Sequence, residues 1–104
     1  MISKKTQTII KNIIVSVGCN KCILFGSHAR GDNTLYSDYD LLVIIEKRLS
    51  VQEKIKLASH LRGKFAEKNI DADIIVKSPD EIEYYKNKTG HIVKHAVAEG
   101  IPVW

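Results

Sequence analysis

Hydrophobic residues recur with a helical period at the start of the chain. The apolar positions between Ser3 and Val17 are separated by steps of one, three and four residues, which places them on one face of an α-helix. They are Ile9, Ile10, Ile13, Ile14 and Val17. The pattern therefore predicts a first helix from Ser3 to about Val17, which Gly18 ends.

Two apolar runs with a polar stretch between them come next. Residues 22–25, Cys-Ile-Leu-Phe, form a short run that stops at Gly26-Ser27, which is typical of a buried strand ending in a tight turn. A second apolar run predicts a strand from about Asp38 to Ile45. Between the two strands we expect a short helix that Gly31 stops, followed by a polar loop over residues 32–37.

A third helix is predicted from its cap and its apolar spacing. Ser50 is followed three residues later by Glu53, which is the pattern of a capping box. Apolar residues then recur at helical spacing, and we expect them to form a buried stripe. The stripe is Val51, Ile55, Ala58, Leu61 and Phe65.

The C-terminal part of the chain predicts one more strand and two more helices. A strand is expected from about Asp71 to Val76. The sequence Ser78-Pro79-Asp80-Glu81 then starts a helix, because it supplies a cap, a proline in the first turn and a glutamate at the third position. Residues 87–90 break this helix, and a last helix runs from about His91 to Glu99. Residues 101–104 form a short tail or an edge strand.

This order of elements predicts an α/β (α+β) fold in which a small mixed sheet packs with helices. The chain has 104 residues and 44% hydrophobic content, enough for one core, so we expect a single domain over residues 1–104. No apolar run has the length of a membrane helix, and the N-terminus lacks the apolar segment of a signal peptide. We therefore expect a cytoplasmic protein.

Charge and cysteine content add little to this picture. The net charge of +4 favours either a polyanionic or acidic partner or, more simply, a solvated lysine-rich surface. Cys19 and Cys22 form a C-x-x-C pair, and His91 and His95 share one helix face, which raises the question of a zinc site. The pairs are too far apart for a zinc finger, and Cys22 opens an apolar strand, so we interpret both cysteines as free thiols of the core.

The turn after the first strand has the features of a phosphate-binding site. Gly26 allows the backbone to approach a ligand closely, and Ser27 would open the short helix. The N–H groups of that helical turn and the Ser27 hydroxyl would then converge on one point, where a phosphate could bind. A Gly-Ser pair after a strand is common, so this signal is weak by itself.

Two aspartates strengthen the interpretation. Asp38 and Asp40 are two residues apart at the start of the second strand, so both carboxylates should project from one face of the sheet. Two like charges that close are unfavourable without a cation, and hard oxygen ligands suit Mg²⁺, which takes the rest of its shell from water and substrate phosphates. Together with the Gly26-Ser27 turn, they indicate a phosphoryl- or nucleotidyl-transfer site.

These motifs resemble those of the minimal nucleotidyltransferases of the DNA polymerase beta superfamily. That family has the pattern G-S-x-A-R-G, five residues, then S-D-x-D-[LI], and residues 26–41 match it without any change in spacing. The resemblance extends to the predicted strand over residues 73–76 with the helix start after it, and to the ending at residues 98–103. It thus covers nearly the whole chain.

The resemblance implies a third acidic residue. In the family this acid lies six residues before the proline, which here is Asp73 before Pro79. In the family, this acid binds the second metal and can deprotonate the attacking hydroxyl group. The residues alone leave Asp71 as an alternative, because it would point the same way, but it lies nearer the strand end.

Other polar and aromatic residues near the motif have several interpretations. Arg30 could neutralise triphosphate charge or pair with an acid and hold the loop. His28, at the variable position of the motif, is expected to face solvent or a partner. Tyr36 and Tyr39 flank the aspartate pair and could stack on a base, although packing is the commoner role. The remaining histidines are expected on helix surfaces; they are His60, His91 and His95.

Three functions are compatible with these residues. The leading hypothesis is a Mg²⁺-dependent nucleotidyltransferase that moves AMP from ATP to a hydroxyl group, with metal ligands Asp38, Asp40 and Asp73. The alternatives are an antitoxin that acts by contact alone and an enzyme that acts on RNA or DNA 3′ ends. The resemblance favours an antitoxin that adenylylates a tyrosine of a small all-helical HEPN partner, because larger relatives carry a further acceptor domain and this chain stops at Trp104.

Overall fold

The fold was analysed in a computed structural model that describes residues 2–104. Nine helices and strands follow one another in the described part of the chain, in the order that the hydrophobic pattern predicts. They are α1 (Lys4–Ser16), β1 (Lys21–Phe25), α2 (Ser27–Arg30), β2 (Tyr39–Ile44), α3 (Val51–Ala66), β3 (Ala72–Lys77), α4 (Pro79–Tyr85), α5 (Ile92–Glu99) and β4 (Ile101–Pro102).

The strands form one mixed sheet in the order β3-β2-β1-β4. β1 runs antiparallel to β2, while β2 and β3 are parallel neighbours joined by the crossover helix α3. The C-terminal segment joins β1 as the short antiparallel strand β4. It was predicted to be either a tail or an edge strand, and it is an edge strand. The predicted mixed sheet packed with helices is therefore confirmed.

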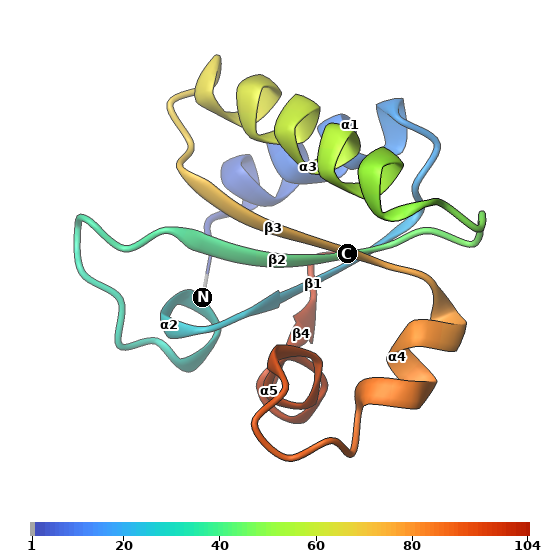
Figure 1. The fold of residues 1–104 in the computed structure, drawn as a ribbon. Helices are drawn as coiled ribbons and strands as arrows, with labels where there is room; N and C mark the ends of the chain where they lie inside the picture. The colour runs from blue at the N-terminus through green and yellow to red at the C-terminus, as the bar shows by residue number, and fades with distance from the viewer. Residues whose placement is uncertain (1) are drawn as a thin grey trace.

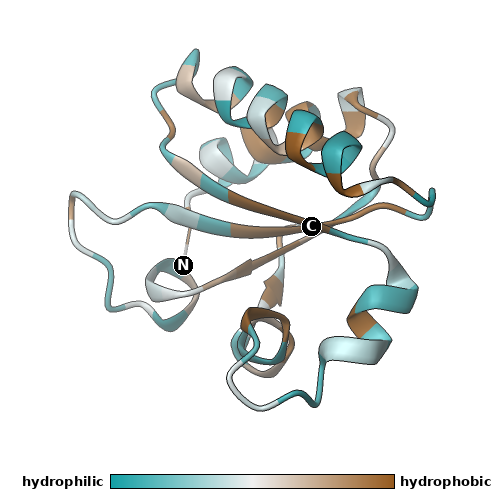
Figure 2. Ribbon diagram, viewed as in Figure 1, coloured by the Kyte–Doolittle hydropathy of each residue, from teal (hydrophilic) through white to brown (hydrophobic). Residues whose placement is uncertain are grey.

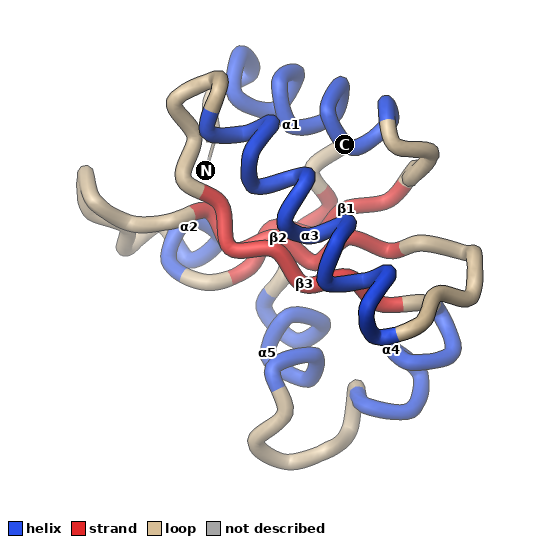
Figure 3. Tube along the Cα trace, turned by 45° about the horizontal axis from the view of Figure 1, so that its top comes forward, coloured by secondary structure: helices blue, strands red, loops and turns tan. Residues whose placement is uncertain are grey.

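Helices cover both faces of the sheet (Figure 1). α1 and α3 lie on one face, and α4 and α5 lie on the other; Figure 3 shows α3 running across β2 and β3. Hydrophobic residues concentrate in the sheet and on the helix faces turned toward it (Figure 2). The larger core lies on the α1 and α3 side, where Ile10, Leu41 and Phe65 are fully buried. A smaller cluster, built from Phe25, Leu42 and Ala96, lies on the α5 side.

Local sequence explains where the helices begin. Ser50 and Ser78 both form complete capping boxes, with Glu53 and Glu81 as the acidic partners, as predicted. At the other end of the chain, a side chain at Gly100 would overlap the Ala96 carbonyl and the Ile23 side chain. Gly100 therefore allows α5 to end close against β1 and the chain to enter β4.

The stripe predicted for α3 is only partly buried. Ala58, Leu61 and Phe65 lie in the core. Val51 and Ile55 are 69% and 61% exposed, so the prediction that these two residues are buried was wrong. The reason is that β3 is an edge strand, and the first turns of α3 stand beside that open edge. Helical spacing finds the side of a helix that faces the sheet, but not how far the sheet extends beneath it.

The topology brings three chain segments to one edge of the sheet. β1 ends at Phe25, while β2 and β3 begin at Tyr39 and Ala72, and all three termini lie at the same edge because β1 is antiparallel to the other two. The loop between α2 and β2 extends outward from this edge (Figure 1). Within residues 2–104, no helix combines the length and the apolar character that crossing a bilayer requires.

Candidate active site

The predicted acidic residues meet at this edge. Asp40 is opposite Phe25 in the antiparallel pair and opposite Asp73 in the parallel pair. Neighbouring residues in register project from the same face of a sheet, so the Asp40 and Asp73 carboxylates share the face that α5 covers farther along. Asp38 immediately precedes β2, and the strand thus begins one residue later than predicted. The structure therefore brings the three predicted carboxylates into one region.

Burial and neighbouring charges both act on the Asp40 carboxylate. Burial raises the pKa of Asp40, and the negative charges of Asp73 and Asp38 raise it further, while His28 and Arg30 act in the opposite direction. Asp40 is partly buried, whereas Asp38 and Asp73 are exposed. The site thus holds a desolvated carboxylate beside two others, which is an arrangement that a bound cation would stabilise.

Gly26 is required by the position of Asp40. Its φ of +73° lies in the left-handed region, which other residues adopt with strain. In addition, a Cβ atom at this position would overlap the Asp40 carboxylate. The glycine that starts the motif therefore lets β1 end directly against the acidic residue of β2.

The turn at Gly26 binds a side-chain carboxylate of the protein itself, that of Glu99, which was not predicted from the sequence. The Gly26 N–H donates a hydrogen bond of 3.1 Å to Glu99 Oε1, and Arg30 Nη1 donates to both Glu99 carboxylate oxygens at 3.2 Å. Glu99 is the last residue of α5. No local pattern links it to the motif, because sheet pairing rather than sequence proximity brings α5 to the turn.

Arg30 forms ion pairs with two acids. Its guanidinium bonds to Asp32 at 3.1 Å as well as to Glu99, and the pKa of Arg30 is raised mainly by the Asp32 hydrogen bond, then by the one to Glu99. The side chain is 48% exposed. The structure thus contains the acid pairing that was one of its two predicted roles, and the phosphate role stays a prediction.

His28 does not face solvent, so the expectation for it was wrong. Only 8% of it is exposed; its ring stacks on Tyr39 with centroids 3.8 Å apart, and Nε2 lies 3.1 Å from the Ser37 carbonyl oxygen. A carbonyl oxygen only accepts, so Nε2 is the donor. His28 faces inward because α2 is one turn long and Tyr39 begins the strand beside it, and it fixes the loop immediately before Asp38.

The other aromatic and histidine residues divide between packing and surface. Tyr39 packs against His28, whereas Tyr36 is 89% exposed and makes no packing contribution. His60 and His95 are on the surface as expected. His91 instead caps α5, with Nδ1 accepting a hydrogen bond from the Val93 N–H.

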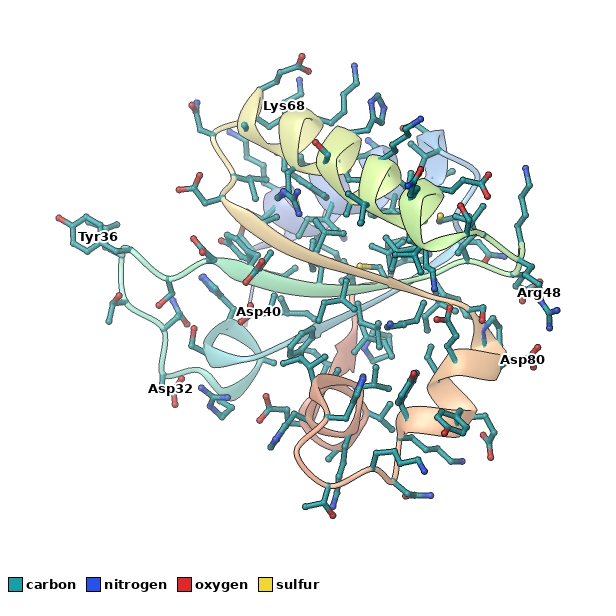
Figure 4. All side chains as sticks on the ribbon, viewed as in Figure 1. Asp32, Tyr36, Asp40, Arg48, Lys68 and Asp80 are labelled. Atoms are coloured by element: carbon teal, nitrogen blue, oxygen red, sulfur yellow. The ribbon has the colours of Figure 1, made fainter. Side chains whose placement is uncertain are left out.

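Two hollows adjoin the acidic residues. One of about 430 Å³ is lined mainly by polar residues, and the Gly26 turn, Asp40 and Glu99 contribute to it. The other, of about 390 Å³, is lined by Asp38, Asp71, Asp73 and Arg62, among others. Asp40 lies between the loop that carries Tyr36 and the body of the sheet (Figure 4). The acidic residues therefore separate two spaces, one on the side of the Gly26 turn and one on the side of α3.

The donor set suits a hard cation that keeps much of its own hydration. Among residues 2–104, no three side chains of His, Cys, Asp or Glu are gathered closely enough to form a metal cage. Carboxylates from two adjacent strands nevertheless fit Mg²⁺, which binds one or two carboxylates together with water and phosphate oxygens.

Cys19 and Cys22 are buried free thiols, as expected. Burial, and to a smaller extent the charge of Cys19, raises the pKa of Cys22 to about 12.

Comparison with protein families gives a match over most of the chain. Residues 7–100 match the family described as polymerase beta, nucleotidyltransferase. A Methanocaldococcus jannaschii protein named as a candidate protein adenylyltransferase is 37% identical over 65 residues, which are 60% of this chain and 61% of that protein. The aligned part thus spans less than two thirds of this relative.

Solved structures share the fold at low sequence identity. A chain of a toxin–antitoxin structure with AMP-PNP superposes with a TM-score of 0.64 at 20% identity, covering 94% of this chain and 72% of that one. A candidate nucleotidyltransferase from Sulfolobus solfataricus gives a TM-score of 0.62 at 23% identity, with coverages of 96% and 80%. A chain of the tri-AMPylated Shewanella oneidensis HEPN toxin complex with its MNT antitoxin gives 0.50 at 21%, with coverages of 94% and 71%.

Replacing Asp40 by asparagine should stabilise the metal-free protein. Asp40 has a higher pKa in the folded than in the unfolded chain, so its ionisation opposes folding as the pH rises above the unfolded value of 3.8. At pH 7 we expect Asp40→Asn to raise the free energy of unfolding in urea by about 1 kcal/mol. The gain should vanish at low pH, where both states carry a protonated Asp40. Glu46→Gln, on an exposed loop, is the control and should change little; an unchanged or lower stability of Asp40→Asn at pH 7 would contradict the repulsion.

A matched pair of glycine variants tests the contact between the turn and Asp40. Gly26 and Gly31 have similar positive φ values, +73° and +82°, but only a side chain at Gly26 meets other atoms. Gly31→Ala should therefore cost about 1 kcal/mol of backbone strain, and Gly26→Ala about 2–3 kcal/mol. In an Asp40→Ala background, the cost of Gly26→Ala should fall toward that of Gly31→Ala, because only the Cβ of residue 40 remains near the added methyl group. Equal costs of the two glycine variants in the wild-type background would show that Asp40 does not constrain the turn.

Proposed function

Because its residues 7–100 match the family, the chain belongs to the polymerase beta nucleotidyltransferase family, and we propose that it transfers AMP from ATP to a hydroxyl group of a partner protein. The observation that carries the proposal is that the Gly26 turn binds the carboxylate of Glu99. The Gly26 N–H and the Arg30 guanidinium hold the Glu99 carboxylate at the turn, Gly26 itself lies against Asp40, and Glu99 and Asp40 line the same hollow. Donors that hold a carboxylate can also hold a phosphate oxygen, and phosphates at this point would face the acidic residues.

The chain's own groups divide into phosphate ligands and metal ligands. Gly26, Ser27 and Arg30 would bind the triphosphate, displacing Glu99 from the turn. Asp38, Asp40 and Asp73 would hold Mg²⁺ with one or two carboxylates to each ion, and the metal, when bound, supplies charge for the phosphates and the departing pyrophosphate. Arg30 is suited to the first role because its planar guanidinium can bind two oxygens at once, as it binds Glu99.

The transfer needs one proton acceptor beside the incoming hydroxyl group. The acceptor oxygen forms a bond to the α-phosphorus, the bond from that phosphorus to the pyrophosphate oxygen breaks, and the hydroxyl proton passes to a base. Asp73 is our candidate base because it is exposed and lies in register with Asp40 on the same face of the sheet. It is near the start of the edge strand β3 and also contributes to the hollow on the α3 side, so an acceptor can approach it around the edge. Asp71 lines the same hollow but lies outside β3.

Relatives support a protein as the acceptor. The M. jannaschii relative is named as a candidate protein adenylyltransferase, and the structural neighbours include chains from toxin–antitoxin complexes, one of them with an AMPylated HEPN toxin. We propose a small all-helical HEPN-type protein as the partner and a tyrosine as the acceptor. The chain would then act as the antitoxin of the pair.

The function is tested by mixing the chain, Mg²⁺-ATP and the proposed small all-helical HEPN-type partner. Mass spectrometry should find one or more increments of about 329 Da on a tyrosine of the partner if AMP is transferred. The Asp38→Asn/Asp40→Asn variant should stay folded, lose Mg²⁺-ATP affinity in calorimetry and transfer nothing. The chain alone, with its open site, should be nearly inactive.

Each other outcome of this experiment identifies a different function. Equal neutralisation of the partner by the wild type and the double variant, with no mass increment, would mean that the chain acts by contact. Increments on RNA 3′ ends, with the partner unmodified, would mean that nucleic acid is the acceptor. Unchanged Mg²⁺-ATP affinity in the double variant would contradict the metal assignment.

The two candidate bases can be separated by kinetics. Asp73→Asn should lower the rate of transfer by at least about 100-fold while weakening ATP binding only slightly, because a base acts mainly in the transition state. Asp71→Asn is the matched control, since it removes a carboxylate from the same hollow, and should change the rate at a saturating acceptor concentration less than about threefold. Equal losses at the two positions would mean that the third acid is misassigned.

A further inference from the structure

Two large apolar residues stand at the tip of the loop beside the site. Leu35 and Tyr36 are 91% and 89% exposed, the highest values among the large hydrophobic residues that the structure describes. They lie in the arm, by which we mean residues 32–38, between α2 and β2. Figure 4 shows Tyr36 projecting outward from the end of the molecule. Such exposure of neighbouring apolar side chains is a feature of contact surfaces.

The arm is held in shape by its own hydrogen bonds. Ser37 Oγ accepts from the Thr34 N–H at 2.9 Å, the Ser37 N–H donates to the Thr34 carbonyl at 3.2 Å, and the Tyr36 N–H donates to Thr34 Oγ1 at 3.3 Å. At its base, His28 binds the Ser37 carbonyl and stacks on Tyr39. These hydrogen bonds restrain the backbone of the tip, and a restrained backbone loses less entropy when a partner binds it.

The arm directs a bound partner to one side of the site. Leu35 and Tyr36 are separated from Asp38 by Ser37 alone, and Asp38 lines the hollow on the α3 side together with Asp71 and Asp73. The proposed ATP site is in the other hollow, around Gly26 and Glu99. A molecule that covers the tip can thus reach the acidic residues without displacing the nucleotide.

The charge around the arm selects the kind of partner. Residues 31–41 contain three aspartates, of which Asp32 pairs with Arg30 just before this range, and the lining of the hollow on the α3 side adds Asp71 and Asp73 against Arg62. A nucleic acid backbone needs lysine or arginine contacts and would be repelled here. A protein surface with an apolar recess and flanking basic residues is complementary both to the tip and to the aspartates.

We propose that the arm is the acceptor-recognition element of this chain. Leu35 and Tyr36 enter an apolar recess of the acceptor protein, and a lysine or arginine residue beside the acceptor hydroxyl group faces Asp71, which is not one of the proposed metal ligands. The inference rests on the proposed function for the chemistry of the site. It adds that acceptor choice depends on the arm, through apolar contact and positive charge.

The experiment uses two defined peptides and one RNA. Each peptide is an amphipathic helix of about 20 residues with a leucine face and one central tyrosine, and lysines border the tyrosine in one and glutamates in the other. Single-stranded oligoadenylate is the nucleic acid probe. Chemical shifts of the Leu35 methyl groups and the Tyr36 ring report contact with the arm, and incorporation of labelled AMP, measured with Mg²⁺-ATP, reports transfer.

The lysine peptide should shift the Leu35 and Tyr36 resonances at concentrations where the glutamate peptide and the RNA do not. It should also be labelled at least tenfold faster than the glutamate peptide. Leu35→Ser/Tyr36→Ser should lose at least tenfold of this labelling and keep its ATP affinity within twofold, whereas Leu35→Ile/Tyr36→Phe should retain both. Val51→Ser, which alters an exposed apolar residue at the opposite end of the sheet, is the matched control and should behave as the wild type.

Several results would overturn the proposal. They are unshifted Leu35 and Tyr36 resonances with the lysine peptide, wild-type labelling by the serine double variant, a preference for the glutamate peptide or the RNA, and a loss of ATP affinity on changing the tip, which would assign Tyr36 to the nucleotide. Shifts at the tip with no AMP incorporated into any probe or into the helical partner would uphold the arm as a contact surface and refute the proposed transfer reaction.

Discussion

The burial of Asp40 beside two other carboxylates, at one edge of the sheet, is the constraint on which this molecule's site depends. Parallel pairing of β2 with β3 puts Asp40 opposite Asp73, and the adjoining Asp38 adds a third negative charge. A fold selected only for stability would place at least one neutral residue here. The rest of the site consists of groups that make this arrangement tolerable: a glycine that makes room for Asp40, and the nearby cationic or hydrogen-bonding groups of Arg30 and His28.

Glu99 gives this arrangement a ligand of its own. Its carboxylate accepts from the Gly26 N–H and from Arg30, so the donors of the turn are satisfied by the protein itself. An anionic substrate must therefore exchange one set of charge-assisted hydrogen bonds for another, which reduces the net gain from binding but keeps the donors oriented. Glu99 ends α5, and the edge strand β4 begins two residues later, so the residue that leaves the turn is close in sequence to this edge strand.

The two sides of the sheet edge are built differently. On the side of the Gly26 turn, the hollow is lined by the turn and by the Arg30–Glu99 ion pair, whereas the hollow on the α3 side has three aspartates in its lining and is bordered by the arm. A site with hydrogen-bond donors on one side and carboxylates on the other fits a reaction in which a nucleotide and an acceptor are held together. His28 joins the two sides, since it belongs to the turn helix and holds the base of the arm.

Local sequence determined most of the secondary structure and the chemical identity of the site. Capping boxes, apolar runs and the spacing of Gly26, Asp38 and Asp40 depend on neighbours within a few residues, so they can be read along the chain. Tertiary structure alone decided the pairing of Arg30 with Glu99, the inward orientation of His28, and the exposure of Val51 at the open sheet edge. Each of these depends on which segments, distant in sequence, the sheet order brings together and where the sheet ends, and no local spacing encodes either.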